Sequence, residues 1–329
     1  MNANTTLAAL DNASGPLDWS RDGPHWPHAE RSRFVEAAGL RWHVQAWNTE
    51  TASTPAEAPS PTHLVLLHGT GASTHSWRSL APLLAASAAV PVLALDLPGH
   101  GFTRAPEGDA EQVPLPDGSR TSVWSLPGMA QAVTVLLQSL GVHRPVFIGH
   151  SAGAAVAIQM VLQGNWGQPP IVALNPALLP MSGWAGPLFS PVAKLLATST
   201  LVPQWFSRRA ASPEVLQRLI DGTGSQLDPL GMALYGRLVR SPEHAAGALR
   251  MMAHWDLGAL SRQLRQLRAP LHLVVGSNDK TVNPVQAQRV GSLLPPGARL
   301  PVVTLAGLGH LAHEEAPERV SAVISQALQ

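Results

Sequence analysis

Short apolar runs alternate with helical stretches along most of the chain. The runs are short enough for buried strands, and the segments between them carry apolar residues at helical spacing. The strand candidates are residues 63–67, 92–95, 146–148, 171–174, 271–275 and 302–305, and the helix candidates include residues 77–85, 127–140 and 152–163. This alternation predicts an α/β fold, with a mostly parallel central sheet and helices on both faces.

Two segments depart from that alternation. Residues 1–30 are rich in Pro, Asp and Trp and predict an irregular N-terminal arm, followed by a hairpin that turns at Gly39. Residues 175–268 contain several helical patterns and no convincing strand, so they predict a helical cap. The cap divides the core into residues 31–174 and 269–329. An insertion at this place commonly covers the carboxyl edge of the sheet, where ligands bind in open α/β folds.

The strongest motif follows the third strand candidate. It reads Gly149-His150-Ser151-Ala152-Gly153 and leads into an Ala-rich helix. A serine on a sharp strand-to-helix turn has strained backbone geometry, so the residues two positions away must be small. The hydroxyl then projects at a helix N-terminus, where the dipole favours developing negative charge. Ser151 is therefore the predicted nucleophile.

A glycine-rich segment after the first strand candidate predicts the oxyanion donors. It reads HGTG over residues 68–71. The backbone N–H of Thr70, with that of Gly71 as the adjacent candidate, is expected to act together with the N–H of Ala152. A glycine-rich turn without a catalytic role is the alternative. His68, in the same turn, is interpreted as a structural histidine.

A serine nucleophile needs a base, and the base needs an acceptor that fixes its tautomer. Asp279 follows the fifth strand candidate and His310 follows the sixth, which gives the chain order Ser, Asp, His expected for an elbow of this kind. His313 competes with His310 as the base. Asp256, inside the predicted cap, is a weaker candidate for the acid, and Asp96, early in the sheet, favours a structural role.

Charge and cysteine content exclude other kinds of chemistry. The 329 residues include 22 basic and 21 acidic ones, scattered along the chain, so no phosphate-binding stripe and no nucleic-acid partner are indicated. Cysteine is absent, which excludes a disulfide framework, a Cys-ligated metal and a Cys nucleophile. Neither a metal nor another cofactor is expected. Ser151 in place of an aspartate excludes dehalogenase and epoxide hydrolase chemistry. A polar N-terminus and the lack of any run of about 18 apolar residues favour a cytoplasmic protein.

The apolar part of the cap has more than one interpretation. Residues 175–206 carry one charged side chain, Lys194, and several prolines. They either pack on the core, line a roomy pocket or touch a membrane surface peripherally. The chain has ten tryptophans against one tyrosine. Core packing competes with substrate binding for each candidate, and the candidates for substrate contact are His150, Gly71, Trp77, Trp184, Trp205 and Trp255.

The motifs resemble the α/β-hydrolase superfamily over residues 33–329. More specific stretches are RDGPHWPH at residues 21–28, THSW at residues 74–77 and MMAHWDL at residues 251–257. With these stretches the chain also resembles the bacteriochlorophyll-biosynthesis hydrolase-like proteins of the BchO family, described as magnesium-chelatase accessory proteins.

The resemblance implies a role in photosynthetic pigment synthesis and puts Ser151, Asp279 and His310 on the triad positions. The leading hypothesis is an esterase-like serine hydrolase that forms an acyl-enzyme on an ester of a porphyrin or chlorin. The alternative is a non-catalytic tetrapyrrole-binding or magnesium-chelatase accessory protein on a hydrolase scaffold. Magnesium chelatase is a candidate partner.

Overall fold

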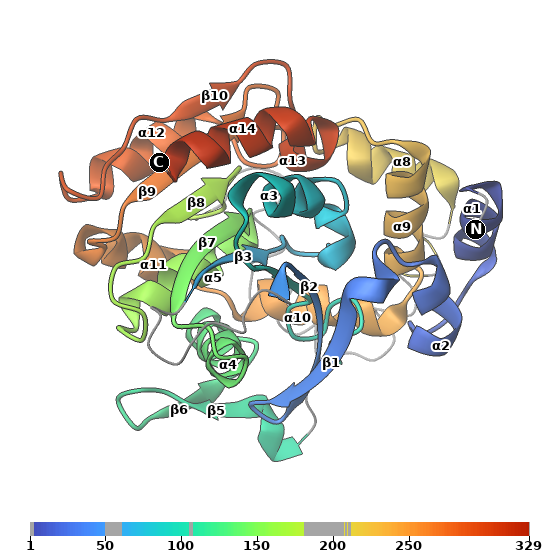
Figure 1. Cartoon of the computed structure of the whole chain (residues 1–329), viewed down its shortest axis with the longest axis horizontal. Coiled ribbons are helices and arrows are strands. Elements are labelled where there is room, and N and C mark those ends of the chain that lie inside the picture. Colours follow the sequence, from blue (N-terminus) through green and yellow to red (C-terminus); the bar gives the residue numbers. More distant parts are fainter. Residues whose placement is uncertain are drawn as a thin grey trace.

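A single sheet runs through the core of the protein. The computed structural model describes residues 3–49, 61–104, 108–180, 207, 209 and 212–328. Within these ranges an eight-stranded sheet has the order β1-β2-β4-β3-β7-β8-β9-β10 (Figure 1). Its strands are β1 Ser32–Ala37, β2 Leu40–Trp47, β3 Thr62–Leu67, β4 Val92–Leu95, β7 Arg144–His150, β8 Ile171–Leu174, β9 Leu271–Gly276 and β10 Val303–Leu305.

The sheet is mostly parallel, as predicted. Strands β1, β2 and β4 pair antiparallel, and every pairing from β4 to β10 is parallel. The hairpin at Gly39 and every strand predicted from an apolar run are present. A further short hairpin was not predicted, because its strands are three residues long and have no readable pattern: β5 Gln112–Pro114 and β6 Arg120–Ser122.

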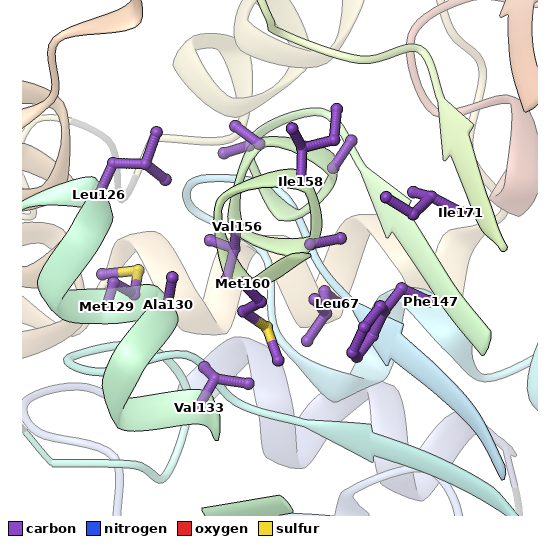
Figure 2. Packing of buried hydrophobic residues seen from close by; sticks show 14 of the residues in the cluster. Leu67, Leu126, Met129, Ala130, Val133, Phe147, Val156, Ile158, Met160 and Ile171 are labelled. Atoms are coloured by element: carbon purple, nitrogen blue, oxygen red, sulfur yellow. The ribbon is translucent and has the colours of Figure 1, made fainter. Parts of the chain in front are cut away.

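Helices cover both faces of the sheet, and each face has its own apolar core. Leu64 and Leu66 point to one face and pack with α3 and α14, while Val65 and Leu67 point to the other and pack with α4 and α5. Figure 2 shows this second core, where Met160 of α5 lies near Leu67. Burial on both faces explains why the strands are continuous apolar runs. The core helices are α3 Leu80–Ala88, α4 Leu126–Ser139, α5 Ala152–Leu162, α12 Val285–Leu293, α13 Ala312–Glu315 and α14 Pro317–Ala327.

The described part of the cap is helical. Each of its helices begins after a Ser or Asp, and Pro follows that residue in the first three, a common helix start. Asp256 caps α11 by accepting the N–H of Ala259 at 2.9 Å, which gives it a structural role. Residues 181–206 of the predicted cap lie outside the described residues. The cap helices are α8 Pro213–Asp221, α9 Pro229–Val239, α10 Pro242–His254 and α11 Leu257–Gln263.

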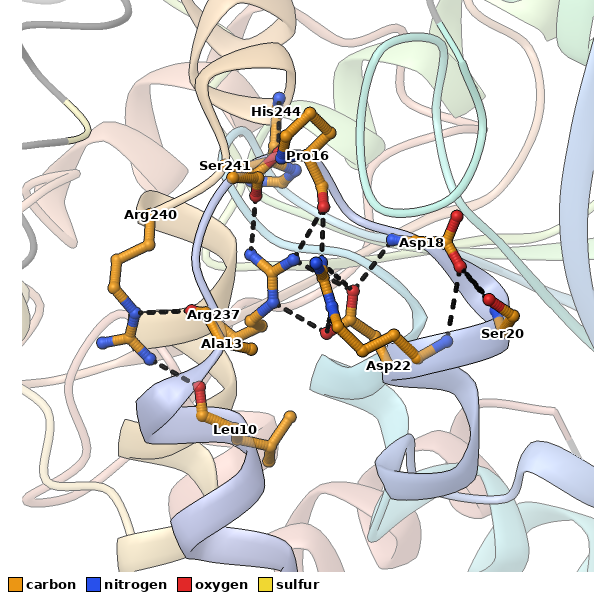
Figure 3. Close-up of polar contacts among 12 residues, drawn as sticks. Leu10, Ala13, Pro16, Asp18, Ser20, Asp22, Arg237, Arg240, Ser241 and His244 are labelled. Carbon is orange, nitrogen blue, oxygen red and sulfur yellow. Dashed lines mark hydrogen bonds and ion pairs between the residues drawn. The ribbon is translucent and has the colours of Figure 1, made fainter.

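The prediction of an irregular arm over residues 1–30 is wrong in part. This segment contains two helices, α1 Ala3–Asn12 and α2 Trp19–Asp22. The α1 sequence has no acidic residue in its first turn and no basic residue in its last. Arg240, the C-cap residue of α9, instead donates to the carbonyl oxygen of Leu10 at 2.7 Å, and Arg237 of α9 donates to that of Gly15 in the segment after α1 (Figure 3). Tertiary contacts therefore stabilise a helix that local sequence signals do not reveal.

The described residues also contain short 3-10 turns. They are η1 Gly23–His25, η2 Ala29–Arg31, η4 Thr74–Trp77, η5 Gly108–Glu111 and η7 Leu264–Gln266.

In the ranges that the structure describes, no helix is long and apolar enough to cross a membrane.

Candidate active site

Ser151 occupies a strained turn between β7 and α5. Its backbone has φ 50° and ψ −113°, a conformation unusual for a residue with a side chain. A Cβ atom at Gly149 would lie 2.5 Å from the backbone of Ala154, and one at Gly153 would lie 2.0 Å from the carbonyl oxygen of Leu67. Neither position therefore accommodates a side chain, as the elbow motif predicts.

The loop after β3 passes directly against this turn. A Cβ atom at Gly69 would lie 3.1 Å from the Cβ of Ser151 and 2.8 Å from Nδ1 of His150. Ala152 is the first residue of α5, so its N–H has no intrahelical acceptor. Among the described residues, neither this N–H nor that of Thr70 donates a hydrogen bond. Both predicted oxyanion donors are thus unpaired and lie on segments that flank the serine.

His244 of α10 holds the same loop from the cap side. The N–H of Gly101 donates to Nδ1 of His244 at 3.0 Å, so the proton sits on Nε2, which donates to the carbonyl oxygen of Gly71 at 3.1 Å. Burial lowers the pKa of His244 to about 4, which keeps the ring neutral near pH 7. Thr70 also contacts α10, through its hydroxyl and the sulfur of Met251 at 3.5 Å. Sequence reasoning did not identify His244.

The acid and base candidates form a buried hydrogen bond. Nδ1 of His310 lies 2.8 Å from Oδ2 of Asp279. Oδ1 of Asp279 accepts the N–H groups of Thr281 and Val282, each at 2.8 Å, and Asn175 donates to Oδ2 at 2.8 Å. Since the carboxylate fixes the proton on Nδ1, the Nε2 lone pair of His310 is free to accept a proton.

Two links join the nucleophile to this pair. Nε2 of His150, the residue before Ser151, donates to the carbonyl oxygen of His310 at 2.9 Å. The N–H of Ser151 donates to the carbonyl oxygen of Leu174 at 2.9 Å. The next residue, Asn175, donates through its side chain to Asp279. The Ser151 hydroxyl itself makes no hydrogen bond to the described part of the chain, a common situation before substrate binds.

Asn175 is a site residue that sequence reasoning missed. It follows β8 with φ 45°, and its side-chain amide donates to Asp279 and, at 3.3 Å, to the carbonyl oxygen of Gly309. A signal was available, because Asn175 directly follows the apolar run of β8 and so lies at the same sheet edge as the acid and base loops.

Other candidates have a different place from the one expected. His150, a candidate for substrate contact, is 2% exposed, and its ring lies between those of His310 and His313 at centroid distances of 4.8 and 4.4 Å. It supports the base rather than facing a ligand. Trp77 is fully buried in the core against His313, 4.7 Å between ring centroids. Trp255 is 8% exposed and packs in the other core. Trp184 and Trp205 lie outside the described residues.

Asp96 and His68 have structural roles. Asp96 is fully buried and accepts a hydrogen bond from Nδ1 of His43 at 2.8 Å. Burial alone would raise the pKa of this carboxyl, but His43 and neighbouring backbone N–H groups outweigh burial and hold the pKa well below its ordinary value. His68 accepts the N–H of Leu97 at 2.9 Å and donates to the carbonyl oxygen of Gly69 at 2.8 Å, which fixes the oxyanion loop.

His244 also lines a cavity of about 420 Å³. Ser151, Asp279 and His310 are not among its described lining residues. Its walls include Arg250 and several aromatic rings, namely Trp19, Phe34, Phe102 and Trp124.

Solved structures share this architecture. The Cif epoxide hydrolase from Acinetobacter nosocomialis has a TM-score of 0.69 at 16% identity, and the match covers 100% of this chain and 97% of that one. An alpha/beta hydrolase fold protein from Burkholderia ambifaria has a TM-score of 0.66 at 20% identity, with coverage of 95% and 100%. At these identities the likeness concerns the fold.

Sequence comparison identifies the family. The model of the alpha/beta hydrolase family matches residues 64–323. The chain is 34% identical over 307 residues to the magnesium-chelatase 30 kDa subunit of Rhodobacter capsulatus, covering 93% of this chain and 97% of that protein. It is 26% identical over 274 residues to the uncharacterized hydrolase YugF of Bacillus subtilis, covering 82% and 91%. The chain therefore belongs to the alpha/beta hydrolase family.

Proposed function

We propose that the protein is a serine hydrolase of the esterase type that acts on a carboxylic ester of a tetrapyrrole. One observation carries the proposal. Ser151 in its strained elbow directly follows His150, whose Nε2 donates to the carbonyl oxygen of His310 at 2.9 Å, and His310 forms a buried hydrogen bond of 2.8 Å with Asp279. Nucleophile, base and orienting acid are the parts that acyl transfer through a serine requires.

In the proposed reaction, Ser151 attacks the ester carbonyl while Nε2 of His310 takes the hydroxyl proton. Asp279 holds the resulting imidazolium, and the N–H groups of Thr70 and Ala152 bind the oxyanion. His310 then gives its proton to the leaving alkoxide, which departs as an alcohol. Water, deprotonated by the same ring, attacks the acyl-enzyme and releases the acid and free serine.

The substrate class rests on similarity. The relative from Rhodobacter capsulatus is named as a magnesium-chelatase subunit, and the two chains match over nearly their whole lengths. A porphyrin or chlorin ester of the photosynthetic pigment pathway is therefore the proposed substrate. We place the reaction in the cytoplasm, with peripheral membrane contact through the cap, and propose magnesium chelatase as a physical partner.

A second candidate function is a non-catalytic tetrapyrrole-binding or chelatase accessory role. One observation favours it: the relative from Rhodobacter capsulatus is named as a subunit of magnesium chelatase rather than as a hydrolase. This candidate predicts that removing the hydroxyl changes nothing in the cell.

A fluorophosphonate probe separates the two functions in the purified protein. The native protein and Ser261→Ala should be labelled, whereas Ser151→Ala should not. Ser261 is a suitable control because it is part-buried and, in the part of the chain that the structure describes, its hydroxyl bonds only to Gly258 of its own helix. Native protein that stays unlabelled would contradict the hydrolase proposal.

The physiological test is complementation of a strain that lacks the gene. Ser151→Ala should fail to restore pigment although the protein is folded and abundant, and the mass of the accumulated tetrapyrrole should identify the substrate. Full restoration by Ser151→Ala would instead establish the accessory role.

A further inference from the structure

One turn of the cap contacts both loops that carry the acid and the base. Residues 222–225, here called the cap turn, connect α8 towards α9. The carbonyl oxygen of Thr223 accepts the N–H of His310 at 3.1 Å and that of Lys280, the neighbour of Asp279, at 3.3 Å. A single backbone oxygen therefore joins two loops that follow different strands of the sheet.

Side chains extend these links on both sides. Oγ of Ser225, which is 3% exposed, accepts the N–H of Leu311 at 2.8 Å. The side chain of Asn278 donates to the carbonyl oxygen of Gly224 at 2.7 Å. The turn is itself braced, because the hydroxyl of Thr223 accepts the N–H of Ser225 at 3.2 Å. The partners are the immediate neighbours of the acid and of the base.

The cap turn packs closely against the loops that carry Asp279 and His310. Gly224 has φ +77°, and a Cβ atom there would lie 2.1 Å from the carbonyl oxygen of Asn278. A Cβ atom at Gly309 would lie 2.4 Å from both the carbonyl carbon of Gly224 and Oγ of Ser225. Because packed surfaces of this kind do not deform gradually, a shift of the turn moves both loops.

We propose that the cap turn is a positioning element for the Asp279–His310 pair, and that Ser225 is its positioning side chain. The turn lies outside the core and contributes no group to the proposed chemistry. Its hydrogen bonds to residues 278, 280, 310 and 311 set the distance and angle between the carboxylate and the imidazole. The kinetic part of this inference rests on the proposed function, whereas the geometric part does not.

The test compares Ser225→Ala with Ser261→Ala, which removes a part-buried cap hydroxyl that bonds only within its own helix. With p-nitrophenyl acetate as the probe ester, Ser225→Ala should lower kcat about 10-fold and leave KM within about 2-fold, because misplaced catalytic groups affect the transition state more than binding. Ser261→Ala should match the native protein. Equal kcat values for the two variants would overturn the proposal.

A second readout does not depend on catalysis. The proton between Nδ1 of His310 and Asp279 gives a downfield NMR resonance that responds to the geometry of that hydrogen bond. It should shift or broaden in Ser225→Ala and stay in place in Ser261→Ala. If the native protein proves inert towards fluorophosphonate yet this resonance moves, the hydrolase proposal fails and the positioning inference stands. An unmoved resonance in folded Ser225→Ala overturns the inference.

Asn278→Ala covers the case in which Ser225→Ala does not fold. Asn278 is exposed, and among the described residues its side chain bonds only to Gly224 of the cap turn. Its loss should move the same resonance in the same direction by a smaller amount. No movement in this variant also counts against the cap turn as a positioning element.

Discussion

Replacing Arg237 with methionine tests how the N-terminal arm is held on the cap. Arg237 is fully buried on α9, and its Nε and Nη2 donate to the two carboxylate oxygens of Asp22 at 2.8 and 2.9 Å. Nη1 donates to the carbonyl oxygen of Gly15 at 3.0 Å, and Nη2 also donates to that of Pro16 at 2.9 Å (Figure 3). Methionine keeps most of the volume and removes all of these donors.

The expected loss of stability follows from what remains around Asp22. Removing one partner of a buried ion pair destabilises a protein by about 3–5 kcal/mol. Asp22 is 2% exposed but keeps Arg21 at 2.9 Å and the N–H of Asp18 at 2.8 Å. We therefore expect a loss near the lower end of that range, about 3 kcal/mol.

The loss should also depend on pH. Burial alone would raise the pKa of the Asp22 carboxyl, but hydrogen bonds from Arg237 and Arg21 outweigh burial and lower it. A carboxyl with a lowered folded-state pKa stabilises the protein above its unfolded-state pKa, and this stabilisation disappears as pH falls through the folded-state pKa. The difference between native protein and Arg237→Met should therefore shrink in acid.

Urea unfolding followed by tryptophan fluorescence measures these differences. Arg240→Met is the matched control, because Arg240 is the C-cap residue directly after α9. Among the described residues it bonds to the backbone carbonyls of Leu10 and Ala13 and to the carboxylate of Asp11 at 3.8 Å. It should lose only about 1 kcal/mol. A double-mutant cycle of Arg237→Met with Asp22→Asn should give a coupling of about 2 kcal/mol or more. Equal losses for the two arginine variants, or a coupling near zero, would refute the reasoning.

Further predictions concern the candidate site. Gly69→Ala places a methyl group 2.8 Å from Nδ1 of His150 and 3.1 Å from the Cβ of Ser151. The kcat for p-nitrophenyl acetate should therefore fall about 100-fold, while circular dichroism verifies that the variant is folded. Asn175→Gly keeps the backbone conformation and removes the donor to Asp279, so kcat/KM should fall about 10-fold, and an unchanged value would exclude the orienting role. The buried, neutral His244 stabilises the folded state less as pH falls from its unfolded pKa towards about 4. His244→Gln should therefore have a flatter stability curve than native protein in urea titrations over that range.

Much of the fold and the order of the catalytic candidates could be predicted from local patterns. Strands buried on both faces are uninterrupted apolar runs, so residues such as Val65 and Leu66 mark a strand without reference to the rest of the chain. The steric demand of the elbow is local as well, because Gly149 and Gly153 lie within two positions of Ser151. The parallel sheet then places the loops after its strands at one edge.

What the sequence did not predict depends on contacts between distant segments. The α1 helix is contacted by Arg240, 230 positions after the Leu10 carbonyl that it binds. His150 is a sequence candidate for substrate contact, yet its ring donates to the carbonyl oxygen of His310, 160 positions away. No periodicity or propensity in either segment carries such information, since the partner residue is set only by the tertiary fold.

The same long-range contacts bear on how the cap works. Helix α9 is bonded to the arm through Arg237 and to the core through Asp228, which accepts from Arg78 at 3.1 Å. Its Tyr235 donates to Glu314 of α13 at 2.8 Å, just beyond the histidine loop, and Arg78 also pairs with that buried carboxylate. Moving α9 away from the arm and the sheet would break the Arg237–Asp22 and Arg78–Asp228 pairs and the Tyr235–Glu314 hydrogen bond. The Arg78–Glu314 pair would remain, but the buried guanidinium of Arg237 would lose its carboxylate, which is strongly unfavourable. These contacts favour α9, together with the cap turn that precedes it, as a fixed support for the acid and base loops over a lid that opens.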